Sequence, residues 1–331
     1  MLLSVVIPVY NSSGTIGRCL DSIYGLPLNE SVFEIIAIDD SSTDNSVELL
    51  KQYADNHSNM VLLYQKTNHR QGAARNRGVA VAKGKYIVFV DSDDEVEPGL
   101  LSAVEMAEKT DAEIVAMQYA KTGNDKAERM EVSLPYTDEK VFSGIDMQIE
   151  HPYWNTAPWG YVYRNTFLES VNYPFAEDVL YEDSDFVNVH LFHARKMAYC
   201  GECGYVMHFN VDSTTHTLSY KHLCDYALLG TRMLEFYECI QNKSSKIADI
   251  ILEGGSYNIM KAFRKLPRLK SCSEVRQFYD RLDAKYERKR LFGYNRPSCY
   301  WNGWTRLCLK HRGMAIAIMG MVIPLMKRVY N

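Results

Sequence analysis

Short apolar runs alternate with amphipathic stretches through the first ninety residues. The apolar runs, each expected to form a strand, are residues 3–9, 33–38, 61–64 and 86–90. The stretches with apolar side chains at helical spacing, each expected to form a helix, are residues 14–24, 45–53 and 72–82. Strands that are apolar throughout are typical of a parallel sheet with both faces covered. The pattern predicts an α/β fold, with a mostly parallel central sheet flanked by helices.

The pattern changes after residue 94. It predicts, in order, a helix at 100–109, a strand at 113–118, an exposed polar loop at 122–131 and several helices between 220 and 290. We therefore expect an α/β domain over residues 1–215 and a helical extension over residues 216–331. Residues 313–326 are almost wholly apolar. They are too few to span a bilayer, which needs about 20 residues.

Polar and acidic residues follow three of the predicted strands. These residues are Tyr10-Asn11, Asp39-Asp40 and the run Asp91-Ser92-Asp93-Asp94. Ligands of open α/β sheets lie beyond the carboxyl ends of the strands, so the three groups point to one site. If the backbone stays extended after residue 90, Asp91 and Asp93 lie on the same side, as half of a Mg²⁺ or Mn²⁺ site. The alternative is an ordinary turn at the strand end.

Five sequence blocks occur in a fixed order along the chain. They are VVIPVYN (5–11), IIAIDDSSTDNS (35–46), QGAARNRG (71–78), GKYIVFVDSDD (84–94) and YEDSDF (181–186). With these blocks, the chain resembles the inverting glycosyltransferase family 2 over roughly residues 1–215. The resemblance implies a nucleotide-sugar-binding catalytic domain of the GT-A fold, followed by an extension that the resemblance does not cover.

The resemblance assigns donor-binding roles to residues of the first four blocks. Asp40 is expected to accept a hydrogen bond from the uracil N3–H, and Arg75 is expected to face the diphosphate. Asp93 is expected to bind the metal ion, and Asp91 is expected to hold the ribose of the donor or to support the metal. The remaining donor contacts are expected from Pro8, Tyr10 and Ser92. Alternatives at these positions are a surface salt bridge for Arg75, a turn-forming Asp39 and a helix-capping Asn45.

The acceptor side is assigned from the rest of the chain. Asp183 matches the family's catalytic base and Glu182 an acceptor contact, although both carboxylates also suit the start of a helix. Trp154 and Trp159 are candidates for stacking on a sugar ring, and the alternative for both is the core. Tyr161 stands where many relatives have Lys. His216 is a candidate third metal ligand, against the alternative of a structural histidine.

Charge is distributed unevenly along the chain. The net charge is −4, but residues 261–331 contain 17 Lys and Arg against four Asp and Glu. A basic extension with an apolar segment suits an anionic membrane surface, and the alternative for that segment is a buried helix. No nucleic-acid-binding motif accompanies the basic residues, so we expect no nucleic acid partner. The eight scattered cysteines and the absence of an export signal predict reduced thiols and a cytoplasmic protein.

Together these features predict a metal-dependent inverting glycosyltransferase. The expected donor is a nucleotide-sugar, with a UDP-sugar preferred. The expected acceptor is a glycan or lipid-linked hydroxyl in cell-envelope polysaccharide assembly, at the inner membrane face. The alternatives are a catalytically silent membrane-associated scaffold and a nucleotidyltransferase, which usually has a Gly-rich, Lys-containing signature near the first strand. The sequence carries no signal for an oligomeric state.

Overall fold

The computed structural model describes residues 1–123, 128–136, 140–152, 154–209, 219–269, 271–286 and 303–330. The chain divides into an N-terminal unit, Met1–Val211, and a C-terminal unit, Asp212–Asn331. Each unit is described by itself below.

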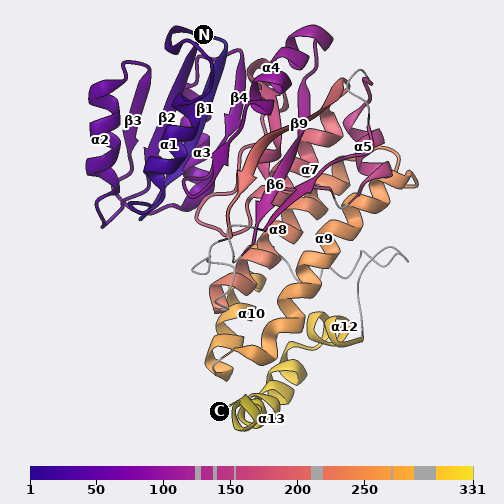
Figure 1. The fold of residues 1–331 in the computed structure, drawn as a ribbon. Helices are drawn as coiled ribbons and strands as arrows, with labels where there is room; N and C mark the ends of the chain where they lie inside the picture. Colours follow the sequence, from indigo (N-terminus) through magenta and orange to yellow (C-terminus); the bar gives the residue numbers. More distant parts are fainter. Residues whose placement is uncertain are drawn as a thin grey trace. The chain divides into compact units, whose positions relative to one another are not determined.

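The four strands predicted in the first ninety residues are confirmed. They are β1 (Leu3–Val9), β2 (Phe33–Asp39), β3 (Met60–Tyr64) and β4 (Tyr86–Phe89), and all four are parallel (Figure 1). β1 lies between β2 and β4, with Val5 opposite both Ile35 and Val88. The carboxyl ends of β1, β2 and β4 therefore meet at one edge of the sheet.

The sheet continues through the second half of the N-terminal unit in the order β3-β2-β1-β4-β8-β6-β9-β5, with β7 paired to β6. The added strands are β5 (Glu95–Val96), β6 (Ile114–Thr122), β7 (Arg129–Val132), β8 (Tyr161–Arg164) and β9 (Met197–Met207). β5, β7 and β8 run opposite to the other strands. The mostly parallel sheet is thus as predicted.

The predicted exposed loop at residues 122–131 is wrong at both ends. Thr122 is the last residue of β6 and pairs with Arg129, the first residue of β7. The guanidinium of Arg129 also donates to both carboxylate oxygens of Glu97, at 2.6 and 2.9 Å. Cross-strand pairing and this distant ion pair stabilise a polar segment whose composition alone indicates a loop.

Helices cover both faces of the sheet because buried side chains alternate along its strands. Val5 and Ile7 of β1 pack in one cluster with residues of α1 (Ile16–Tyr24), α2 (Ser46–Asn56) and α4 (Gly99–Thr110). Val6 of β1 and Ile36 of β2 pack in a second cluster on the other face. That cluster includes residues of α3 (Arg70–Val81), α5 (Gly144–Glu150), α6 (Asn165–Val171) and α7 (Asp183–His193).

The C-terminal unit is helical, as predicted. Its longer helices are α8 (Tyr220–Cys239), α9 (Lys246–Lys265), α10 (Cys272–Tyr286), α12 (Gly303–Lys310) and α13 (Arg312–Tyr330). The apolar segment lies within α13, where Ala315, Met319 and Ile323 form a buried stripe at four-residue spacing. None of the described helices has the length and apolar character needed to cross a membrane.

Candidate active site

The four residues Asp91-Ser92-Asp93-Asp94 form a turn rather than a continuation of β4. The backbone N–H of Asp94 donates to the Asp91 carbonyl oxygen at 3.1 Å, and the last bond to β1 is made by Val90. The expectation of extended backbone after residue 90 is therefore wrong, because local hydrogen bonding replaces the missing strand partner. Arg18 donates to the Asp93 carbonyl oxygen at 2.6 Å, and the Ser92 hydroxyl lies 2.7 Å from that of Ser12.

Asp94 is a site residue for which the sequence analysis gave no role. It is 3% exposed and accepts hydrogen bonds from the Tyr205 hydroxyl at 2.7 Å and the His208 N–H at 2.8 Å. Burial raises the pKa of Asp94 well above its ordinary value, and the negative charges of Asp91 and Asp93 raise it further. The sequence signal for Asp94 was its position at the end of the acidic run that follows the apolar strand β4.

Arg75 links the two acidic clusters that the sequence singled out. Its guanidinium is 2% exposed and donates to Asp91 Oδ1 at 2.7 Å and to Glu182 Oε1 at 2.5 Å. It also lies over the ring of Phe175, 5.4 Å from the ring centroid. Burial lowers the pKa of Arg75, but the carboxylates of Asp91 and Glu182 outweigh this and raise it. The alternative of a surface salt bridge is excluded because the ion pair is buried.

Glu182 and Asp183 lie at the start of α7, where the structure gives them different surroundings. Glu182 is 4% exposed and forms the ion pair with Arg75. Asp183 is partly buried, and its Oδ1 accepts a hydrogen bond from the Ser184 N–H at 2.9 Å. Burial, followed by the charge of Glu182, raises the pKa of Asp183 to about 7. A carboxyl group with this pKa changes protonation state near neutral pH.

Asp40 follows β2 and is joined to the start of α3. It is 3% exposed, and its Oδ1 accepts a hydrogen bond from the His69 N–H at 2.8 Å. Burial raises the pKa of Asp40, although the backbone bond from His69 opposes the shift. Pro8 is buried in β1, whereas Tyr10 is 48% exposed beside the same sheet edge.

The residues around Asp40 form turns and a helix cap. Asp39 accepts a hydrogen bond from the Ser42 N–H at 3.3 Å, as a turn-forming residue does. Asn45 makes no side-chain capping bond at the start of α2. Asn45 does occupy the N-cap position of α2, while the side-chain bond from the Ser46 N–H, at 3.0 Å, is accepted by Asp44.

The aromatic candidates pack against neighbouring rings. Trp159 is 6% exposed and stacks on Tyr205, with ring centroids 4.4 Å apart. Trp154 meets the edge of Tyr119 at 5.8 Å. Trp159 therefore lies in the core, which was the alternative for both residues.

The structure describes two of the three candidate metal ligands, Asp91 and Asp93. The candidate ligand His216 lies outside the described residues. Among those described, no three His, Cys, Asp or Glu side chains are arranged to hold a metal ion by themselves. A metal held by Asp91 and Asp93 would therefore need further ligands, and Mg²⁺ commonly takes these from substrate phosphate and water.

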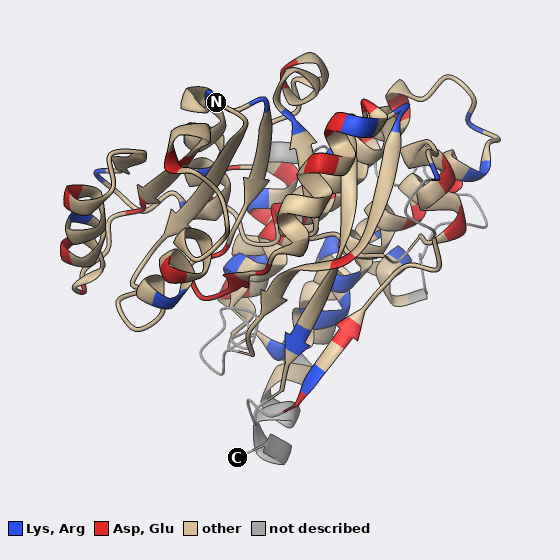
Figure 2. Cartoon of the chain, turned by 45° about the horizontal axis from the view of Figure 1, so that its top comes forward, with Lys and Arg blue, Asp and Glu red and all other residues tan. Residues whose placement is uncertain are grey.

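The structure thus brings several predicted residues together through α3. Arg75 of this helix contacts both Asp91 and Glu182, and His69, which precedes the helix, contacts Asp40. In Figure 2, acidic residues of the N-terminal unit include a group on the loops that follow the central strands.

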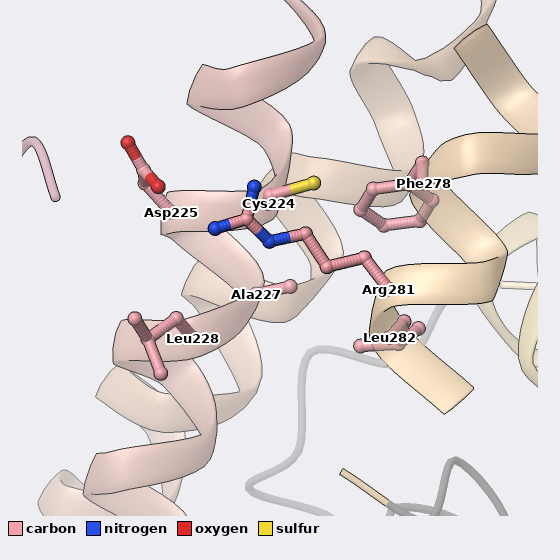
Figure 3. Close-up of a pocket in the computed structure, with 7 residues that line it drawn as sticks. All are labelled: Cys224, Asp225, Ala227, Leu228, Phe278, Arg281 and Leu282. Atoms are coloured by element: carbon pink, nitrogen blue, oxygen red, sulfur yellow. The ribbon is translucent and has the colours of Figure 1, made fainter. Parts of the chain in front are cut away.

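A separate small cavity lies between α8 and α10 in the C-terminal unit (Figure 3). Arg281 reaches from α10 toward Cys224 and Asp225 of α8, and its guanidinium donates to the Tyr220 hydroxyl at 3.3 Å. The cavity has a volume of about 10 Å³. Because this is room for about one water molecule, the cavity is too small for a nucleotide or a sugar.

Comparison with known proteins agrees with this architecture. Residues 4–172 match the sequence profile described as Glycosyl transferase family 2. The uncharacterized glycosyltransferase YibD of Escherichia coli (strain K12) is 33% identical over 231 residues, covering 67% of this chain and 66% of YibD. The poly(ribitol-phosphate) beta-glucosyltransferase of Bacillus spizizenii is 45% identical over 97 residues, which are 29% of this chain and 15% of that protein.

Solved structures share the fold. The crystal structure of S. aureus TarS 1–349 in complex with UDP-GlcNAc has a TM-score of 0.62 at 18% identity, over 99% of this chain and 92% of TarS 1–349. The mannosyltransferase PcManGT from Pyrobaculum calidifontis, in complex with GDP-Man and Mn²⁺, has a TM-score of 0.52 at 15% identity, over 96% of this chain and 86% of PcManGT. The predicted GT-A fold is confirmed. The chain therefore belongs to glycosyltransferase family 2.

Proposed function

We propose that this chain is an inverting glycosyltransferase that moves a sugar from a nucleotide-sugar to an acceptor hydroxyl. The observation that carries this proposal is the pair of bonds from Arg75 to Asp91 and Glu182, at 2.7 and 2.5 Å. These bonds link the acidic turn after β4 to the carboxylates at the start of α7. Sugar transfer requires the donor-binding residues and the base to lie close together.

The proposed donor is a UDP-sugar. Asp40 would accept the uracil N3–H, and the base would lie against Pro8 and the exposed ring of Tyr10. Asp91 and Ser92 would contact the rest of the donor. Structures of the same fold hold UDP-GlcNAc, UDP and GDP-Man, which supports a nucleotide-sugar as the donor class.

A divalent cation fits the chemistry of the acidic turn. Asp91 and Asp93 offer hard oxygen ligands of the kind that Mn²⁺ and Mg²⁺ prefer. The raised pKa of Asp94 reflects burial and the negative charges of Asp91 and Asp93, and a cation would offset this charge. When bound, the metal would neutralise negative charge on the departing diphosphate.

Asp183 is the proposed base. It would take the proton from the acceptor hydroxyl as the hydroxyl oxygen bonds to the anomeric carbon. The bond from that carbon to the diphosphate breaks in the same step, so the configuration inverts. A pKa of about 7 suits this role, because a general base works best when its pKa lies near the operating pH. Glu182 would contact the acceptor from beside the Arg75 ion pair.

The proposed acceptor is a glycan or lipid-linked polymer of the cell envelope. A family relative is named as acting on poly(ribitol-phosphate), which supports this class of acceptor. The basic C-terminal unit supports an anionic membrane surface as a partner. In the described part of that unit, Lys261, Arg264, Lys265 and Arg268 form no ion pair with a carboxylate.

The test is sugar transfer from a panel of UDP-glucose, UDP-galactose, UDP-GlcNAc and GDP-mannose, with and without Mn²⁺. We expect release of the nucleoside diphosphate from one donor, faster with Mn²⁺, and a product of inverted anomeric configuration. If no donor is hydrolysed or transferred under any of these conditions, the silent-scaffold alternative is favoured.

A further inference from the structure

One side of α3 carries the segment that leads into Glu182 and Asp183. Gly72, Arg75 and Asn76 share a helix face, because residues three and four apart are neighbours on a helix. All three contact residues 175–182. At Gly72 the two backbones approach so closely that a Cβ atom would lie 2.2 Å from the Ala176 carbonyl oxygen.

Asn76 pairs with this segment as a neighbouring strand would. Its Nδ2 donates to the Phe175 carbonyl oxygen at 3.0 Å, and its Oδ1 accepts from the Phe175 N–H at 2.9 Å. The same Nδ2 lies 2.9 Å from Glu177 Oε1. The Asn76 side chain therefore satisfies the N–H and C=O groups of Phe175 and fixes the position of the segment along the axis of α3.

Arg75 connects the same segment to the turn after β4. Its two terminal nitrogens donate to Glu182 and Asp91, and its guanidinium lies over the Phe175 ring. The planar guanidinium holds two carboxylates at a fixed separation, which a flexible ammonium group does less well. Both carboxylates offset the charge of Arg75 within the protein.

We propose that Arg75 and Asn76 are positioning residues, which hold the Asp183 segment at a set distance from donor-binding Asp91. This inference rests on the proposed function, in which Asp91 contacts the donor and Asp183 is the base. Neither residue needs to touch the reacting atoms. A displacement of about 1 Å between reacting groups can cost about 100-fold in rate, so the loss of either contact lowers turnover.

The first test is Asn76→Ala. We expect kcat to fall at least about 10-fold. The dissociation constant of the donor, measured by calorimetry, stays within about twofold, because Asn76 contacts neither Asp40 nor Asp91. A purely structural role would not separate kcat from donor binding in this way.

The matched control is Asn165→Ala. Asn165 Nδ2 also donates to two backbone carbonyl oxygens, those of Ala82 at 3.3 Å and Gly84 at 3.1 Å. These groups precede β4, at the opposite end of the strand from Asp91. We expect this variant to lose a similar amount of thermal stability and to keep the wild-type kcat.

A variant of Arg75 keeps the test valid if Asn76→Ala does not fold. Arg75→Lys should lower kcat more than it weakens donor binding. Its effect should be less than additive with that of Asn76→Ala, because both act on one segment.

Three results would overturn the inference: a wild-type kcat in Asn76→Ala, a loss of donor affinity parallel to the loss of kcat, or the same kcat loss in Asn165→Ala. The wild-type protein in the same assay separates the two proposals. Absence of transfer by the wild type contradicts the proposed function itself, whereas normal transfer by Asn76→Ala contradicts only the positioning role.

Discussion

Asp183 and Glu182 are adjacent carboxylates with different environments. Glu182 is paired with a buried guanidinium, whereas the pKa of Asp183 is raised first by burial and then by the negative charge of Glu182. Arg75 limits the shift by lowering the pKa of Asp183, which still reaches about 7. Burial raises the pKa of Glu182 as well, but Glu182 is held in the ion pair with Arg75, so the two neighbouring carboxyl groups can serve different roles.

The first prediction concerns the pH dependence of turnover. A base must be ionised, so kcat should fall as the pH drops through about 7. Asp183→Asn should lower kcat by a factor of about 10² to 10⁴ and leave the donor dissociation constant unchanged. Steady-state kinetics between pH 5 and 9 would measure the profile. A full rate at pH 5, or normal turnover in the variant, would assign the base to another residue.

The second prediction concerns stability at the same residue. The folded-state pKa of about 7 lies above the value of about 3.9 expected in the unfolded chain. Stability from this group is therefore present below about pH 4 and is lost as the pH rises to 7. Asp183→Asn should be more stable than the wild type at pH 8, by up to about 4 kcal/mol, and similar to it near pH 4. Thermal unfolding at both pH values checks this, and a variant less stable at pH 8 would contradict it.

At the scale of elements, α3 is the helix on which the site depends. The segment 175–182 contacts its first two turns, and three residues in the left-handed region lie nearby: Arg70 (φ 70°), Asp178 (φ 59°) and Tyr181 (φ 67°). Non-glycine residues adopt this conformation at a cost, and such residues concentrate at functional sites. The close approach at Gly72 shows how little space separates the helix from the segment.

The third prediction is that Gly72→Ala displaces this segment. The added Cβ would meet the Ala176 carbonyl oxygen, a backbone atom that cannot rotate away. Overpacking of this kind costs about 1 to 3 kcal/mol, and kcat should fall with the displacement. Thermal unfolding and turnover of Gly72→Ala would be compared with those of Gly14→Ala, because a Cβ at Gly14 meets no atom within 4 Å. Equal stability and turnover in the two variants would show that the contact is unimportant.

Much of the fold was predictable from local pattern, and the parts that were not depend on distant contacts. The strands β1 to β4 follow from continuous apolar runs, which are visible in the sequence without knowledge of distant contacts. β7 was missed because its polar residues pair with β6 and with Glu97. The same holds in the site: Arg75 and Asp91 were identified as single residues, but only tertiary structure brings the guanidinium between two carboxylates.

At the scale of the whole chain, charge separates the two units. Residues 261–331 carry the excess of Lys and Arg, and Lys261 and Lys265 both lie over the ring of Tyr226, at 5.3 and 4.8 Å. The two ammonium groups at one ring repel each other, and an anionic surface would reduce this repulsion.

The fourth prediction is that the chain binds vesicles containing anionic lipid. Each basic residue near such a surface contributes about 1 kcal/mol, and the attraction weakens with salt. Lys261→Gln with Lys265→Gln should weaken binding about 10-fold or more, and Lys51→Gln with Lys83→Gln in the N-terminal unit is the control. Sedimentation with anionic and neutral vesicles measures this. Equal binding to both vesicle types, or none to either at low salt, would contradict it.

The most direct test of the central claim is the titration of UDP, with Mn²⁺ present, into the wild type and three variants. If residues after β2, after β4 and at the start of α7 form one nucleotide-sugar site, Asp40→Ala and Asp93→Ala should each bind UDP at least about 10-fold more weakly. Asp183→Asn should bind it as the wild type does. Absence of binding by the wild type, or undiminished affinity in Asp40→Ala and Asp93→Ala, would contradict the account.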